Sequence, residues 1–253
     1  MATEAVVKSD DTTIGAIHSI YTGGMVDGPG IRTVIFLSGC SLRCLYCHNP
    51  DTWFSIRGNK KTVAEVLEEV LKYRSYYKFS GGGITISGGE PADQPFFLKE
   101  LLLACRENSI HTVLDTSGFA TEDIAEEILP YVDLLMLDFK AFDPLLYKKL
   151  TKSNVKRPKL TLSAAKRINI PTWIRFVLVP GLTDDPNDLR QMAAFFKQHE
   201  NIEKIDVLPF HKHGEHKWDE LEYEYQLHHT LPPTPEQILQ VQQIFDIYPC
   251  NVI

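Results

Sequence analysis

The chain carries three of its five cysteines within eight residues, in the stretch 39–49 that reads GCSLRCLYCHN. Cys40, Cys44 and Cys47 are separated by three and then two residues, and no fourth cysteine lies nearby. A structural zinc site closes a shell of four ligands, and an ordinary ferredoxin cluster also takes four thiolates. Three thiolates around a four-iron cluster would leave one iron open to a further ligand. The spacing therefore predicts an iron–sulfur centre with one open iron.

Two other interpretations of these cysteines remain open. Three thiols and His48 would complete a four-ligand zinc site, and three thiols without a metal would have only a structural role. Of the remaining cysteines, Cys105 shares a helical face with Phe97 and Leu101, which is typical of core packing. Cys250 lies near the C-terminal end, where the sequence assigns it no role.

Composition and charge exclude several classes of protein. With 253 residues, of which 43% are hydrophobic and 23% charged, the chain can bury a substantial core. A formal charge of −7 argues against nucleic acid as a partner, and no apolar run approaches the roughly 20 residues that a membrane helix needs. Residues 1–13 are polar and acidic, so we expect a flexible tail there and one domain over residues 14–253. Five cysteines without a secretory signal indicate a cytoplasmic protein.

Apolar, β-branched runs alternate along the chain with amphipathic segments. The runs predict core strands at residues 33–37, 84–87, 111–115, 133–138, 172–179 and 204–208, and an edge strand is predicted at 14–22. Helices are predicted to begin near residues 62, 95, 121, 143, 161, 185 and 234. Thr62–Glu65 and Thr234–Gln237 match capping boxes, and Asp143 and Asp185 each precede a proline at the first helical position.

Strands that alternate with helices form a parallel sheet with right-handed crossovers. The chain offers six such units, whereas a complete eight-unit barrel takes about 250 residues and would leave little for loops. The predicted fold class is therefore α/β, a partial (β/α)6 TIM-like barrel that is open on one side and has its helices outside. An open side would admit a bulky substrate.

Unusual residues follow the predicted strands, where parallel α/β folds carry their chemistry. They are the cysteine loop, Ser87-Gly88-Gly89-Glu90, Asp115-Thr116, Asp138 with Lys140, and Pro209-Phe210-His211. Two glycines would let the backbone approach a ligand, and Asp115 and Asp138 would repel each other unless a cation lay between them. Arg175 interrupts an apolar strand, which is costly unless it faces a partner. We therefore expect these residues to share one functional rim.

The spacing C-x3-C-x2-C is the signature of the radical S-adenosylmethionine (SAM) enzymes, which the chain resembles. Within that superfamily, segments 26–32 (VDGPGIR) and 47–53 (CHNPDTW) resemble the activating enzymes of pyruvate formate-lyase. The resemblance extends from about residue 14 to about residue 248. It implies a six-unit partial barrel, a [4Fe–4S] cluster on Cys40, Cys44 and Cys47, and SAM bound at the open iron.

The resemblance also implies roles for individual residues. Those expected to contact SAM are Tyr46, Asn49, Gly88, Gly89, Glu90, Asp115, Lys140, Arg175 and His211. A monovalent cation, Na⁺ or K⁺, is expected on Asp115, Thr116, Asp138 and the main-chain carbonyl of Met136. Asp27 and His48 are expected on the side of the peptide substrate. His213 and His216 are expected at the surface, although their spacing from His211 also fits a zinc site.

The implied reaction cleaves SAM with one electron to methionine and a 5′-deoxyadenosyl radical, which takes a hydrogen atom from a glycine of pyruvate formate-lyase. A flavodoxin or ferredoxin is the expected electron donor, and the chain is expected to be a monomer with no nucleic-acid or membrane partner. Activation of another glycyl radical enzyme is the nearest alternative. Many such activases carry further CxxC clusters, and residues 48–104 contain no cysteine. A non-enzymatic iron–sulfur protein for electron transfer or sensing would need neither the Gly-Gly-Glu segment nor the two aspartates.

Overall fold

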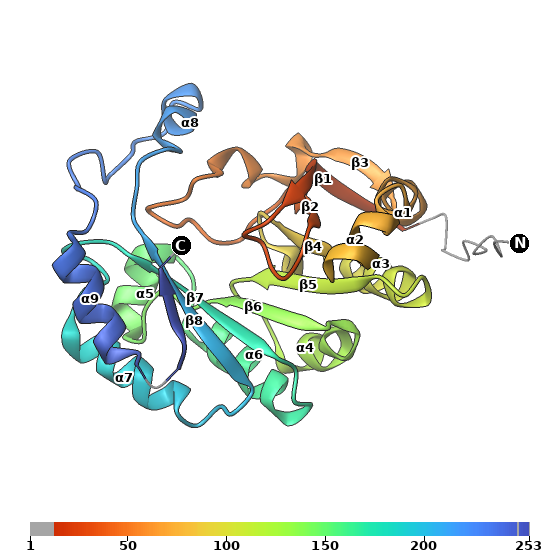
Figure 1. The fold of residues 1–253 in the computed structure, drawn as a ribbon. Helices are drawn as coiled ribbons and strands as arrows, with labels where there is room; N and C mark the ends of the chain where they lie inside the picture. Colours follow the sequence, from red (N-terminus) through yellow and green to blue (C-terminus); the bar gives the residue numbers. More distant parts are fainter. Residues whose placement is uncertain (1–12, 247, 253) are drawn as a thin grey trace, which may run out of the picture.

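The computed structural model describes residues 13–246 and 248–252, so the predicted tail over residues 1–13 lies almost entirely outside the described residues. Within this part of the chain, nine strands form one sheet in the order β3-β1-β2-β4-β5-β6-β7-β8-β9 (Figure 1). Their bounds are β1 Ile14–Gly24, β2 Arg32–Leu37, β3 Asn59–Thr62, β4 Gly83–Gly88, β5 His111–Thr116, β6 Leu134–Asp138, β7 Thr172–Leu178, β8 Ile202–Pro209 and β9 Cys250–Val252. The strands β2 and β4 to β8 are parallel, which confirms the six predicted core strands.

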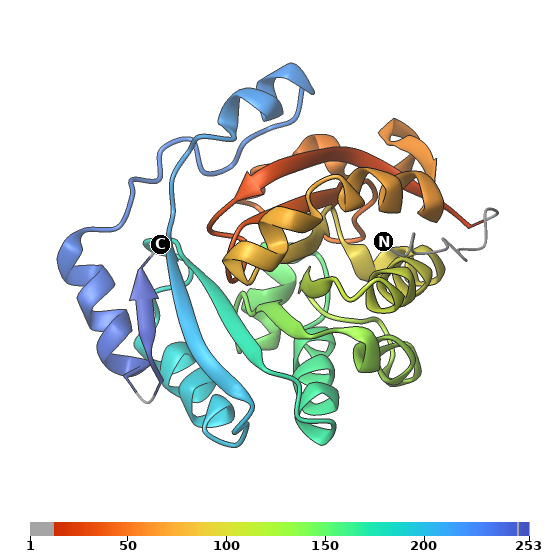
Figure 2. The ribbon, with the colours of Figure 1, turned by 45° about the vertical axis from the view of Figure 1, so that its right-hand side comes forward.

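The two edges of the sheet differ from the expectation. β1 pairs antiparallel with both β2 and β3, so the prediction of an edge strand at residues 14–22 is wrong: β3 covers its outer side. At the other edge, β9 adds a short strand parallel to β8. In the described chain β3 and β9 do not pair with each other, and they lie on opposite sides of the molecule (Figure 2). The sheet is therefore open, which confirms the predicted partial barrel.

Most of the helices cover the outer face of the curved sheet (Figure 1). Neighbours along this layer are α1 with α3, α3 with α4, α4 with α6, and α7 with α9. The bounds are α1 Val63–Leu71, α2 Arg74–Ser80, α3 Pro95–Glu107, α4 Glu122–Ile128, α5 Pro144–Thr151, α6 Lys156–Arg167, α7 Pro186–Phe196, α8 Glu215–Glu220 and α9 Pro235–Ile244. No helix of the described residues is long and apolar enough to cross a membrane.

Capping residues explain which helix starts the sequence could predict. Thr62 Oγ1 accepts the N–H of Glu65 at 3.2 Å, and the Glu65 carboxylate accepts the N–H of Thr62 at 2.7 Å. The second capping box at Thr234 is also formed, and Asp143 and Asp185 cap α5 and α7 as predicted. By contrast, α6 begins at residue 156 and not near 161, where the prediction placed its start. Asn154 Oδ1 accepts the N–H of Lys156 at 2.9 Å, one turn before the predicted start.

The remaining elements carry patterns too weak to predict. They are α2, β3, α8 and β9. Gly81 ends α2 in the left-handed conformation with φ 69°, and Gly83 opens β4, so the three consecutive glycines 81–83 connect this helix to this strand. Cys105 is fully buried in α3, which confirms its predicted place in the core. Cys250 lies on β9 opposite Ile205.

Candidate active site

A cavity of about 480 Å³ opens at the carboxyl ends of the parallel strands. Each of the six core strands contributes to its wall, through Phe36, Ser87, Asp115, Asp138, Arg175 and Leu208. All three clustered cysteines line the same cavity. Residues from seven separate segments of the chain therefore meet at one place, in agreement with the rule for parallel α/β folds.

Cys40, Cys44 and Cys47 are free, half-buried thiols. Burial raises the pKa of all three, that of Cys44 to about 12, since a thiolate is costly to remove from water. Such thiols ionise when a cation binds them. In the described part of the chain, no group of three or more His, Cys, Asp or Glu side chains is arranged to hold a single metal ion. The three thiols line one cavity, where they can serve as ligands of a multi-iron group.

Gly88 and Gly89 bring the end of β4 against the cysteine loop. A Cβ atom on Gly88 would lie 2.3 Å from the nitrogen of Leu37, and one on Gly89 would lie 2.2 Å from the oxygen of Gly39. Gly88 also has φ +112°, where a side chain is strained. The missing side chains therefore allow two chain segments to pack closely, a reason for glycine that the sequence did not reveal.

Two ion pairs lie on the floor of the cavity. Arg175 Nη1 is 3.0 Å from Asp115 Oδ2, and Lys140 Nζ is 2.8 Å from Asp138 Oδ2. Ser87 Oγ also donates to Asp115, at 2.7 Å. The buried charge of Arg175 is thus compensated directly by Asp115, whereas Asp138 is its cross-strand neighbour and pairs with Lys140.

The charges of this floor shift the pKa values of its carboxyl groups. Burial raises the pKa of Asp115, although Arg175 opposes the shift. Burial acts on Asp138 in the same way, but Lys140 and Arg175 outweigh it and hold the pKa of Asp138 below its ordinary value. Asp27 is a third carboxylate on the cavity wall, and burial followed by the charge of Asp115 raises its pKa. Three carboxylates thus face two cations, so the cavity favours further positive charge.

A buried arginine fixes the turn that carries Asp27. Arg32 Nη1 donates to the carbonyl oxygen of Pro29 at 2.9 Å, and Nε donates to Thr85 Oγ1 at 2.7 Å. Thr85 Oγ1 in turn donates to the carbonyl oxygen of Asp27 at 2.6 Å. Arg32 is completely buried, so this chain of hydrogen bonds anchors the turn to β4.

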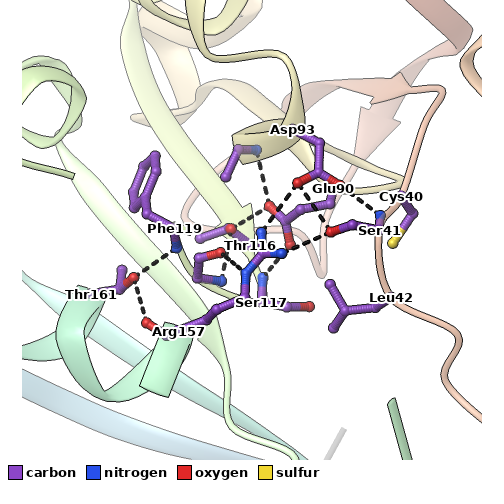
Figure 3. Close-up of polar contacts among 12 residues, drawn as sticks. Cys40, Ser41, Leu42, Glu90, Asp93, Thr116, Ser117, Phe119, Arg157 and Thr161 are labelled. Carbon is purple, nitrogen blue, oxygen red and sulfur yellow. Dashed lines mark hydrogen bonds and ion pairs between the residues drawn. The ribbon is translucent and has the colours of Figure 1, made fainter. Parts of the chain in front are cut away.

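Glu90 lies behind the cavity wall and is only 1% exposed (Figure 3). Its carboxylate accepts hydrogen bonds from Thr116 Oγ1 at 2.5 Å, from the Ser117 N–H at 2.7 Å and from the Ala92 N–H at 3.0 Å. Burial raises its pKa to about 7, even though these hydrogen bonds act in the opposite direction. Glu90 therefore ties the end of β4 to the end of β5 through three hydrogen bonds.

Arg157 crosslinks the same region from α6 (Figure 3). Its guanidinium donates to Ser41 Oγ at 2.7 Å, to Asp93 Oδ1 at 3.2 Å and to the carbonyl oxygen of Gly118 at 3.0 Å. The cysteine loop is thereby joined to the segments that follow β4 and β5.

Residues 211–223 fold back over the end of the cysteine loop. Trp218 Nε1 donates to the carbonyl oxygen of Cys47 at 2.8 Å, and Lys217 Nζ donates to Asn49 Oδ1 at 2.9 Å. His48 Nε2 lies 3.1 Å from the carbonyl oxygen of His211, and the two imidazole rings are 4.3 Å apart. The contact fixes the position of the His48 ring against the segment that follows β8.

Most of the predicted site residues line the cavity. They are Asp27, Cys40, Cys44, Tyr46, Cys47, His48, Asn49, Gly88, Gly89, Asp115, Asp138, Lys140, Arg175 and His211. Glu90, Thr116 and the side chain of Met136 do not line it; the Met136 side chain packs against Val113 and Leu134. His213 and His216 are exposed, as predicted.

Tyr46 lines the cavity although the residue is almost completely buried. Its hydroxyl oxygen is inaccessible to solvent and has no hydrogen-bond partner among the described residues, which costs free energy. Lys140 Nζ lies 5.7 Å from the centre of the Tyr46 ring.

Sequence reasoning missed several residues that hold the site together. Arg157 is one, and no spacing or motif marks it. Lys217 and Trp218 form hydrogen bonds to residues more than 160 positions earlier in the chain, and a local sequence pattern does not reveal such contacts. Two other supporting residues could have been found from the sequence. Arg32 and Trp53, whose carbonyl oxygen accepts the N–H of Cys40, lie in the segments 26–32 and 47–53.

Residues 34–193 match the family model of the radical SAM superfamily. The chain is 45% identical to the pyruvate formate-lyase-activating enzyme of Clostridium pasteurianum, over 85% of this chain and 90% of that protein. It is 41% identical to the pyruvate formate-lyase 1-activating enzyme of Escherichia coli K12, over 94% and 97%. Among solved structures, a radical SAM methyltransferase from Sphaerobacter thermophilus matches with a TM-score of 0.63 over 94% of this chain and 77% of that one. At 17% identity, that likeness concerns the fold alone.

An open parallel barrel with three cysteine thiols in its cavity, matched by this family model, defines a radical SAM enzyme. Membership of the superfamily implies a [4Fe–4S] cluster and SAM. Within it, the chain belongs to the family of pyruvate formate-lyase-activating enzymes. The resemblance inferred from segments 26–32 and 47–53 is therefore confirmed.

Glu90→Gln tests the buried carboxyl network through its pH dependence. Because folding raises the pKa of Glu90 from 4.5 to about 7, the stability that this group contributes is complete below pH 4.5 and is lost as the pH rises to about 7. The free energy of unfolding of the wild type, relative to the variant, should fall by ~3 kcal/mol over this window. Urea unfolding of the cluster-free proteins at several pH values measures it.

Glu107→Gln removes one exposed carboxylate from α3 and is the matched control for the change in charge. A wild-type advantage over Glu90→Gln that stays constant from pH 4.5 to pH 8 would contradict the expected titration.

Proposed function

We propose that this chain activates pyruvate formate-lyase by abstracting a hydrogen atom from one of its glycines, which leaves a glycyl radical on that enzyme. The names of the relatives from C. pasteurianum and E. coli support this substrate. One structural observation carries the proposal: the three thiols open onto the same cavity as the paired charges at the strand ends.

Cys40, Cys44 and Cys47 would hold the cluster. When bound, the cluster would supply one electron to the sulfonium of SAM. SAM would then split into methionine and a 5′-deoxyadenosyl radical. The residues of the chain bind and orient SAM beside it. The Gly89 N–H donates to the carbonyl oxygen of Leu37, so the carbonyl oxygens of Gly88 and Gly89 are proposed to accept from the amino group of SAM. The two cations of the floor suit its carboxylate.

Tyr46, Asn49 and His211 lie around the remaining cavity wall and are proposed to contact the rest of SAM. Glu90 takes part indirectly, because its carboxylate holds the turn after β4 in place.

Asp27 and His48 are proposed to face the glycine loop of the substrate. Both line the cavity, and each is fixed by a neighbour: the turn of Asp27 by Arg32, and His48 by the carbonyl oxygen of His211.

A flavodoxin or a ferredoxin is the proposed electron donor. We further propose that the chain acts as a monomer in the cytoplasm, where reducing conditions keep its thiols free.

A monovalent cation, Na⁺ or K⁺, is proposed between Asp115 and Asp138, with Thr116 and the carbonyl oxygen of Met136 as further ligands. Oxygen atoms are the ligands that hard cations prefer. The excess of carboxylates over cations in the cavity supports the site, since the carboxylate of SAM adds another negative charge.

Replacing Na⁺ and K⁺ by tetramethylammonium at constant ionic strength tests the cation site. This ion is too large to lie between two aspartates, so the affinity of the cluster-loaded protein for SAM should fall by ~10-fold, or about 1.4 kcal/mol. Calorimetric titration of SAM measures it. Asp115→Asn is the control, because it should lose the dependence on the ion. Equal affinity in all salts would mean that Arg175 and Lys140 suffice.

Cys44→Ala tests the cluster ligands. Without this thiolate the loop should retain only a small fraction of the wild-type iron after anaerobic reconstitution, as measured by iron analysis and by visible absorption. Cys105→Ala is the matched control, because it removes a buried thiol of the core. It should keep the full iron content and lose only ~1 kcal/mol of stability. Full iron content in Cys44→Ala would refute the assignment.

The proposed activity is tested under anaerobic conditions with dithionite, SAM and purified pyruvate formate-lyase. We expect 5′-deoxyadenosine and, by electron paramagnetic resonance, a glycyl radical on the substrate. A substrate with its radical glycine replaced by alanine is the control. If 5′-deoxyadenosine forms but the radical appears only with a different glycyl radical enzyme, the substrate is wrong. If none forms, the radical SAM reaction itself is refuted for this chain.

A further inference from the structure

The charges of this acidic chain are unevenly distributed. Residues 144–183 contain nine lysines and arginines and no aspartate or glutamate, although the whole chain has a formal charge of −7. Four of these lysines lie at the end of α5 and the start of α6, and they are all exposed: Lys148, Lys149, Lys152 and Lys156. None of them forms an ion pair with another described residue. We refer to these four residues as the basic corner.

The basic corner is attached directly to the cysteine loop. The N–H of Arg43 donates to the carbonyl oxygen of Thr151 at 2.7 Å, and the N–H of Leu45 donates to that of Leu150 at 2.9 Å. These two residues flank Cys44. On the other side of the corner, Arg157 donates to Ser41, next to Cys40. The turn that carries Lys152 is therefore bound at both ends to the loop that holds the thiols.

The stability of the helices does not account for these charges. Lys148 and Lys149 lie in the last turn of α5, where positive charge is favourable. Lys156 is the first residue of α6, where the helix dipole makes positive charge unfavourable, and the first turn of this helix holds no acidic residue. A charge that opposes local stability and has no partner within the described chain is best explained by an external partner.

We propose that the basic corner is the docking surface for the protein that delivers the electron, and that this partner is recognised by carboxylates around its redox centre. The inference rests on the proposed function, which requires such a carrier. Flexible, well-hydrated lysines suit a brief encounter between two proteins better than a tight interface. Opposite charges would steer the carrier towards the side of the cysteine loop that contains Cys40 and Cys44.

The step at this surface is a transfer of one electron. The reduced carrier loses one electron and is oxidised, and the iron–sulfur centre held by the cysteine loop accepts this electron and is reduced. No bond is made or broken, and no group is transferred. The shorter the path between the two centres, the faster the transfer, which is why attachment of the corner to the residues beside Cys44 matters.

The double variant Lys152→Glu/Lys156→Glu tests the docking surface. Its matched control, Lys78→Glu/Lys197→Glu, makes the same change in net charge at exposed positions on α2 and at the end of α7. These helices precede β4 and β8, so both positions lie towards the amino ends of the parallel strands, away from the cavity at their carboxyl ends. Binding of purified flavodoxin to the cluster-loaded proteins is measured by calorimetry. We expect ~10-fold weaker binding for the test variant at low salt and less than ~2-fold for the control.

Salt and stability provide two independent readouts. Affinity of the wild type should fall as ionic strength rises, and the test variant should lose most of this dependence. Glutamate at position 156 should stabilise the start of α6, and glutamate at position 152 should destabilise the end of α5, so the two effects should largely cancel and thermal stability should change little while binding falls. Reduced binding therefore would not be attributable to unfolding.

Assays with two reductants separate this inference from the proposed function. With dithionite, the test variant should form 5′-deoxyadenosine and activate pyruvate formate-lyase at the wild-type rate; with reduced flavodoxin, both should fall ~10-fold. Equal flavodoxin affinity in test and control variants would overturn the docking surface. A test variant that binds flavodoxin normally but activates pyruvate formate-lyase poorly with dithionite would assign the corner to the substrate instead. A wild type that is inactive even with dithionite would refute the proposed function.

Discussion

The cysteine loop depends on hydrogen bonds from its neighbours, because residues 39–49 include no helix or strand. Backbone groups that are shielded from water must find partners elsewhere. They find them in the end of α5, in Asp93, which accepts the N–H of Ser41, and in Trp53, whose carbonyl oxygen accepts the N–H of Cys40. The thiols are thus positioned by the barrel as a whole, and a change in any of these supports would move them.

The cavity contains two kinds of ionisable groups, which are stabilised in different ways. The thiols lie where burial disfavours the thiolate, so their ionisation is coupled to the binding of a positive group. The floor, by contrast, holds permanent ions, which are tolerated because Asp115 and Arg175, and Asp138 and Lys140, compensate each other. A zwitterionic ligand can exchange partners with such pairs without leaving a charge unpaired. This explains why one cavity can favour both an iron–sulfur group and an amino acid.

Local sequence patterns predicted those parts of the structure that are determined by interactions between residues close together in the chain. The six core strands, the capping boxes and the strand-end aspartates follow from periodicity, from helix capping and from the rule for parallel sheets. Residues that act over long separations could not be predicted in this way. Arg157 and Trp218 gain their roles only when α6 and α8 pack beside the cysteine loop, and Glu90 turns away from the cavity because Thr116 and Ser117 supply donors behind it.

The segment 211–223 links the two halves of the open barrel through the cysteine loop. It follows β8, near one edge of the sheet, yet its hydrogen bonds reach Cys47 and Asn49, which follow β2 near the other edge. Gly214 allows this approach, since a Cβ atom there would lie 2.6 Å from the Cα atom of His48. An open sheet has no strand pairing to fix the distance between its edges. The contact between this segment and the loop supplies that constraint at the cavity itself, so the geometry of the site and the distance between the two sides of the open sheet are determined together.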